Sequence, residues 1–180
     1  KSVLSMGPKA SDYARARARF IQARILEKEF ADQSVKSRAS RVSLVLAIKT
    51  EKLEKAQRAY QAVLRYGSPN VSVNALERLS GLYSQYVTSL REMPLPKGLS
   101  DQEEPMFRSE MSRLAIPLEE KSVETMAQAV RKARELDLRN GVIAKLQRQL
   151  NKLNLRRSNR LSLGSIEPKL GLPGFQEVGS

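Results

Sequence analysis

The sequence lacks histidine and cysteine, two residue types on which many enzyme sites depend. Their absence excludes the commonest general base, the thiolate nucleophile and the ligands of nearly every zinc site. A carboxylate-only or Ser-Lys site could still exist, but no pattern in the sequence points to one. The lack of cysteine fits a reducing cytosol and also compartments where disulfides are avoided, so it does not indicate a location.

Aromatic residues and long apolar runs are scarce as well. Aromatics make up 5% of the 180 residues, and tryptophan is absent. The richest apolar run, Val42 to Ile48, is interrupted by Ser43 and falls far short of the about 20 residues that span a bilayer. What remains is dominated by Ala, Leu, Arg, Lys, Glu and Gln, the strong helix formers. We therefore expect an all-α fold.

The net charge of +13 is unevenly distributed along the chain. Residues 1 to 66 carry 15 Lys and Arg against 6 Asp and Glu, and residues 139 to 180 carry 8 against 2. The middle, residues 67 to 138, carries 9 against 11. Both ends are thus basic, which favours acidic partners, anionic surfaces or nucleic acid over neutral ones.

Apolar residues recur at spacings of three and four and predict six helices. Ser11 and Asp12 are the expected N-cap region of the first helix, Gly67 and Pro69 end the second, and Pro117 opens the fifth at its first position. Asn140 and Gly141 are expected to end that fifth helix. The predicted helices cover residues 11–32, 36–66, 72–93, 100–116, 117–139 and 142–154.

Two details of these helices are specific enough to check. The second helix is unusually long, and a break near Lys49 and Thr50 would split it into a hairpin. At the start of the fourth helix, Ser100-Asp101-Gln102-Glu103 has the pattern of a capping box, with negative charge at the positive end of the helix.

Two matching helical phrases stand far apart in the chain. In residues 55–63 a small residue, Ala56, is followed by the large Tyr60 and then by Val63. In residues 121–129 the same spacing is filled by a small, a large apolar and again a small residue. A small residue followed at four and seven positions by packing residues places all three on one helix face. Such a face is typical of a helix that docks closely on a neighbour. The second phrase contains Ser122, Met126 and Ala129.

These phrases resemble parts of tetratricopeptide repeats, which are helical hairpins of 34 residues. Residues 76–83 resemble the first helix of such a unit, and the two phrases resemble second helices of successive units. The later unit departs from the pattern, because its second helix comes thirty residues late and residues 94–116 look like an insertion. The first-helix positions are Leu76, Leu79, Ser80 and Tyr83.

The inserted stretch, with residues 116–122 after it, resembles a phrase in large repeat-containing envelope proteins of gliding and predatory bacteria. This resemblance implies a non-enzymatic scaffold in the cell envelope, outside the cytoplasm and within a larger assembly; a cytoplasmic location is the alternative. We therefore expect stacked antiparallel helical hairpins, a fragment of an α-solenoid of tetratricopeptide type. Residues 1–10 form an irregular entry, 11–154 the repeat domain and 155–180 an extended or disordered tail. Since the chain begins at Lys1, we expect a mature or trimmed fragment.

Recognition by a repeat scaffold would use the concave face formed by the first helices of its hairpins. Tyr60 and Tyr83 are expected to pack between helices, whereas Tyr86 or Tyr66 is expected at the surface. The candidate partner-binding residues are Arg78, Gln85 and Tyr86.

Two basic groups are candidate contacts for anions or acidic partners. Alternating arginines of the first helix spread around it, which favours a broad solvated patch over any base-reading geometry. A second group near the C-terminal end resembles a short basic cluster for an acidic partner or anionic lipid head groups. The first group is Arg15, Arg17, Arg19 and Arg24; the second is Lys152, Arg156, Arg157 and Arg160.

No catalytic, cofactor or metal site is predicted. Carboxylates at the helix starts are explained by the helix dipole, which favours acidic residues there. The sequence favours a protein interaction scaffold whose oligomeric state stays open; a nucleic-acid-binding helical protein is the main alternative. An enzyme or regulatory subunit with an unrecognised carboxylate site is a further one. The carboxylates concerned are Glu103, Glu104, Glu119 and Glu120.

Overall fold

The computed structural model describes residues 11–164, with side chains as far as residue 159, and its regular elements are all helical. The predicted fold class, all-α, is confirmed. Five α-helices and one short 3-10 helix make up this part of the chain. Their bounds are α1 Asp12–Asp32, η3 Ala39–Arg41, α2 Val42–Leu64, α3 Pro69–Arg91, α4 Glu103–Glu135 and α5 Asn140–Gly164.

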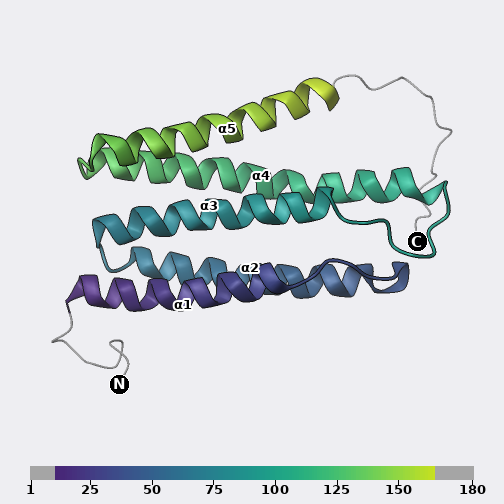
Figure 1. Cartoon of the computed structure of the whole chain (residues 1–180), viewed down its shortest axis with the longest axis horizontal. Helices are drawn as coiled ribbons and strands as arrows, with labels where there is room; N and C mark the ends of the chain where they lie inside the picture. Colours follow the sequence, from purple (N-terminus) through teal and green to yellow (C-terminus); the bar gives the residue numbers. More distant parts are fainter. Residues whose placement is uncertain (1–10, 165–180) are drawn as a thin grey trace, which may run out of the picture.

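Consecutive α-helices run in opposite directions, so that α2 and α4 point the same way (Figure 1). Helix α1 packs on α2, α3 packs on α1, α2 and α4, and α5 packs on α4. Within residues 11–164 no helix combines the length and the apolar character needed to cross a membrane.

Helix α3 is the centre of this arrangement. Its predicted stripe is confirmed, because all seven of its apolar residues are buried. Two apolar clusters meet along it: one joins α1, α2, α3 and the first half of α4, and the other joins α3 to the second half of α4 and to α5. Burial on most sides explains why buried residues recur on every turn of α3 from Val71 to Leu90. The stripe consists of Leu76, Leu79, Leu82, Tyr83, Tyr86, Val87 and Leu90.

The two matching phrases lie on buried faces, as predicted. Ala56, Tyr60 and Val63 are fully buried on α2, and the second phrase is buried on α4. On α4, Ser122 meets Ser80 of α3: the Ser80 hydroxyl donates to the Ser122 carbonyl at 2.7 Å, and the Ser122 hydroxyl donates to the Ser80 carbonyl at 3.0 Å. Only small side chains permit two helix backbones to come this close.

The predicted N-cap region is confirmed: Ser11 is the N-cap of α1, and its hydroxyl accepts the Ala14 N–H at 3.2 Å. The far end of α1 is held by Lys49, which is 2% exposed. The Lys49 ammonium donates to the carbonyls of Phe30 at 2.6 Å and Gln33 at 2.8 Å, where the helix dipole favours a cation. The possible break near Lys49 and Thr50 does not occur, since α2 is continuous from Val42 to Leu64.

The predicted fourth and fifth helices are one helix, α4, and the predicted opening of a helix at Pro117 is wrong. Residues on both sides of this proline, among them Ala115 and Glu119, are buried. Packing before and after Pro117 offsets the cost of its missing N–H, and Pro117 itself is exposed. Only one half of the predicted capping box is present: the Glu103 carboxylate accepts the Ser100 N–H at 2.8 Å, but α4 begins at Glu103 and its N-cap is Gln102, which makes no side-chain capping hydrogen bond.

The turn after α4 also differs from the prediction. The chain reverses at Asp137, whose φ of 45° lies in the left-handed region, and the Leu138 N–H donates back to the Ala133 carbonyl at 3.0 Å. Asn140 and Gly141 consequently open α5 instead of ending a helix.

Helix α5 extends beyond the predicted domain boundary. It continues past Asn154 to Gly164, so residues 155–164 are helical and not an extended tail. The predicted irregular entry, residues 1–10, and the remainder of the predicted tail, residues 165–180, lie outside the described residues.

The close approach of α3 and α4 can be tested at Ala129, which is 0% exposed. Replacing it with Leu should lower the free energy of unfolding by about 1 to 3 kcal/mol, because the added carbons overcrowd a packed interface. Urea denaturation measures the change. Ala144→Leu, on an exposed position of α5, is the control and should change stability little; equal stability of both variants would contradict the packing.

The continuity of α4 can be tested by Pro117→Ala. An alanine restores the missing N–H inside a helix and should raise the free energy of unfolding by about 1 to 3 kcal/mol. Pro105→Ala is the matched control, since Pro105 lies in the first turn of α4, where the N–H has no intrahelical partner. An unchanged or lowered stability of the Pro117 variant would favour two separate helices.

Candidate functional site

A polar groove runs between α1, α3 and α5. Two adjoining hollows of about 670 and 240 Å³ form it, and they share Glu77, Gly81 and Gln149. Most of its lining side chains are polar or charged, and they come from the three odd-numbered helices. We call this hollow the polar groove.

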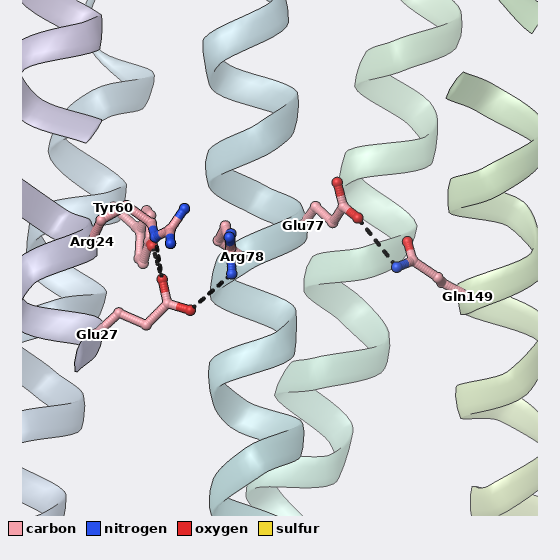
Figure 2. A network of polar contacts seen from close by, with 6 residues as sticks. All are labelled: Arg24, Glu27, Tyr60, Glu77, Arg78 and Gln149. Atoms are coloured by element: carbon pink, nitrogen blue, oxygen red, sulfur yellow. Dashed lines mark hydrogen bonds and ion pairs between the residues drawn. The ribbon is translucent and has the colours of Figure 1, made fainter. Parts of the chain in front are cut away.

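Glu27 of α1 is the first node of the polar groove (Figure 2). One carboxylate oxygen lies 3.2 Å from the Arg78 guanidinium of α3, and the other lies 3.4 Å from Arg24 and accepts the Tyr60 hydroxyl of α2. The Glu27 side chain is 18% exposed. Three donors around one half-buried carboxylate tie α1, α2 and α3 together, and the partial burial strengthens these bonds.

The Tyr60 hydroxyl acts here as a donor. Burial raises the pKa of the Tyr60 phenol above its ordinary value, and the hydrogen bond to Glu27 and its charge raise that pKa further. The ring is fully buried and packs edge-on against Phe20, with centroids 5.9 Å apart. Tyr60 therefore stays neutral at physiological pH and is unsuited to act as a base or nucleophile.

Glu77 of α3 is the second node, and it joins α3 to α5. One of its oxygens lies 2.7 Å from the Lys145 ammonium and accepts the Gln149 amide N–H at 3.2 Å. Figure 2 shows Glu77 and Arg78 leaving α3 toward different neighbours, Glu77 toward α5 and Arg78 toward α1. The Gln149 side-chain oxygen is buried and has no hydrogen-bond partner within the described part of the chain.

The floor between the two nodes is open at Gly81. This residue is exposed, and a Cβ atom placed on it would meet no atom within 4 Å. The backbone of α3 is therefore accessible at Gly81, and there is space above it for a bound group.

The structure brings together two of the three predicted partner-binding residues. Arg78 and Gln85 are exposed and both line the polar groove. The expected exposure of Tyr86 is wrong: it is 4% exposed, its hydroxyl lies 2.8 Å from the Thr50 hydroxyl, and its ring packs edge-on against Phe30. One residue along a helix turns the side chain by about 100°, which carries Tyr86 from the groove into the core.

The arginines predicted on the first helix separate in the structure. Arg24 lines the polar groove. Arg15 pairs with Asp12 at 3.7 Å and Arg19 donates to Gln22 at 3.2 Å. Arg17 is exposed and is not among the residues lining the groove. The four arginines thus form no common row, in agreement with their alternating spacing.

The basic cluster predicted near the C-terminal end lies on α5. Lys152 and Arg156 are exposed and line the polar groove. Arg157, the next residue, is half-buried and is not among the lining residues. The side chain of Arg160 lies outside the described part of the structure.

The carboxylates of the two predicted helix starts do not converge, and Glu119 lies in the middle of α4 and not at a helix start. Glu103 and Glu119 are sixteen residues apart on α4, or about 24 Å along its axis. The Glu103 pKa is lowered by the N–H and the hydroxyl of Ser100, and buried Glu119 pairs with Arg91 at 3.2 Å. Among residues 11–164, no three Asp or Glu residues are grouped closely enough to hold a metal ion.

Sequence reasoning missed Glu27, Glu77, Lys145 and Gln149. Each of them is an ordinary surface residue by type, and only packing of α1 and α5 against the central pair of helices makes it part of a site. One signal was present: positions 145, 149, 152 and 156 are separated by four, three and four residues, so they share one face of a helix.

The raised pKa of Tyr60 gives a test by pH. A phenol whose pKa is higher in the folded state keeps its proton there at a pH where the unfolded chain loses it. The contribution of Tyr60 to the free energy of unfolding is therefore fully present below about pH 10 and falls as the pH rises above that value. Tyr60→Phe should remove up to about 1.4 kcal/mol per pH unit from that decline. Urea denaturation of both proteins between pH 8 and 11 measures the difference; parallel curves would contradict a buried, protonated Tyr60.

Comparisons with known proteins supply no template for this groove. No protein-family model, no curated protein and no solved structure matches the chain. The assignment of a function therefore depends on the groove itself and on the residues that line it.

Proposed function

We propose that the chain is a non-enzymatic interaction scaffold that holds a segment of a partner protein in the polar groove. The observation that carries this proposal is the open floor at Gly81, flanked by polar side chains from three helices. A bound segment could lie along α3 and take hydrogen bonds and ion pairs from both sides. The unpaired Gln149 oxygen would accept a donor from such a segment once its side chain turned toward it.

The charges of the groove favour an acidic partner. Its lining contains five basic side chains and two carboxylates. Glu27 and Glu77 are already paired with basic residues of the groove, while Lys152 and Arg156 extend the positive charge along α5. Acidic side chains of a bound segment would therefore be attracted to the α5 side of the groove. The basic lining residues are Arg24, Arg78, Lys145, Lys152 and Arg156.

The finer architecture belongs to the same proposal. We take the pair α1 and α2 and the pair α3 and α4 as two helical hairpins of tetratricopeptide type, with α5 as the first helix of a third. Helices α1, α3 and α5 would then be first helices, which in this arrangement form the recognition face. The resemblance noted in the sequence supports a place in a cell-envelope assembly outside the cytoplasm.

The test places a bulky side chain in the polar groove. Gly81→Trp should block binding without unfolding the chain, since a side chain there meets open space; Gly81→Ala is the matched control. Both variants and the parent chain are used to capture proteins from the organism of origin, with quantitative mass spectrometry. We expect one or a few proteins to be retained by the parent and by Gly81→Ala and to fall about tenfold with Gly81→Trp. Equal capture by all three would refute the groove as the site.

Nucleic-acid binding stays the alternative function, favoured by the +13 charge. Each phosphate neutralised would add about 0.9 to the slope of log affinity against log salt. Retention on duplex or single-stranded DNA with a steep salt slope, unchanged by Gly81→Trp, would favour the alternative over the scaffold.

A further inference from the structure

A second groove, with apolar walls, lies between α2 and the first half of α4. Its volume is about 990 Å³, and Tyr86 and Leu90 of α3 form part of its floor. Leu46 on the α2 wall and Phe107 and Leu114 on the α4 wall are only partly buried. We call this hollow the apolar groove. It is distinct from the polar groove, which faces another side of α3.

The dimensions of the apolar groove fit one face of a helix. Its walls extend from Val42 to Arg58 on α2 and from Glu103 to Lys121 on α4, or about 24 and 27 Å. Both walls are long enough to lie beside a helix of about sixteen residues, which rises about 24 Å. Their partly buried apolar side chains can cover the apolar face of such a helix and leave the rest in water.

Both walls are helical, which limits the kind of segment that can bind. The backbone groups of α2 and α4 are already bonded within their own helices, so an extended segment would find no backbone partners there. A helix satisfies its own backbone bonds and needs only apolar contact. Met106 on the rim is 64% exposed, and covering it would remove a large apolar side chain from water.

The two ends of the apolar groove differ in charge. Because α2 and α4 run in the same direction, both of their N-termini lie at one end, where Glu103 also lies (Figure 1). At the other end the lining contains Arg58 and Lys121. Arg58 also pairs with Glu54 at 3.5 Å, but both side chains are more than half exposed, so this pair competes only weakly.

We propose that the apolar groove binds an amphipathic helix of about sixteen residues from a partner protein, lying antiparallel to α2 and α4. In that orientation an acidic first turn of the bound helix meets Arg58 and Lys121, and a basic last turn meets Glu103. Its negative C-terminal dipole also lies beside the positive N-termini of α2 and α4, which stabilises the same direction. The proposal does not depend on the polar groove.

The test uses two designed peptides of identical composition, each of sixteen residues with one leucine stripe. The first carries glutamates in its first turn and lysines in its last turn, and the second carries the reverse. Both are cross-linked on the solvent face to equal helicity, which circular dichroism checks, so that only charge direction differs. Fluorescence polarisation with the full chain should show the first peptide binding at least tenfold more tightly, with the ratio shrinking in 1 M salt.

Variants of the chain locate the binding. Leu114→Asp should weaken the first peptide at least tenfold, whereas Ile116→Asp, also on α4 but not in the groove lining, should not. Met106→Gln, at an exposed position that folding tolerates, should weaken it several-fold. Gly81→Trp should leave this binding unchanged, which separates it from the proposed scaffold function.

Three results would overturn the proposal. Equal affinity for the two peptides would contradict the proposed antiparallel orientation of the bound helix. A dimer of the full chain that Met106→Gln dissociates, with no peptide bound, would assign the groove to a second copy. A monomer that binds neither peptide would show that no partner helix of this kind is accommodated, as when another part of the same chain fills the groove.

Discussion

Helices α3 and α4 approach each other so closely at Ser80 and Ser122 that each hydroxyl donates to the backbone of the other helix. The rest of the described fold depends on this contact. It lies near the middle of both helices, and the small buried residues Ala115, Ala129 and Ala133 of α4 maintain the packing on either side of it. A helix held at this many points keeps its geometry through a proline, which would end a weakly packed one.

The length of α4 then determines where the two grooves lie. At 33 residues α4 extends over about 50 Å, so its second half can receive α5 while its first half lies beside α2 without closing on it. The polar groove forms where α5 meets α3, and the apolar groove forms where α2 and α4 stand apart. Two surfaces of different character thus result from one pair of closely packed helices: the lining of one is mostly polar or charged, and the lining of the other is mostly apolar.

Much of the fold could be predicted from the sequence, because it depends on local signals. The N-cap at Ser11, the apolar stripe of α3 and the buried small residues of the two phrases follow from spacing alone. The errors came where tertiary contacts outweighed a local signal. Pro117 is a strong start signal on its own, and Asn140 with Gly141 is a strong stop signal. Packing of α4 on α3 overrides the first, and the left-handed Asp137 makes the turn before the second is reached.

The candidate sites divide in the same way. The sequence by itself determined the helical class, the buried faces, the absence of histidine and cysteine chemistry, and the surplus of basic residues, because these depend on composition and on the periodicity of the helix. Only the tertiary structure decided which charged residues meet. It placed Glu27 between Arg24 and Arg78, joined Glu77 to α5, and moved Tyr86 into the core. Periodicity fixes the direction of a side chain around its own helix, whereas the partner of that side chain depends on how the helices pack.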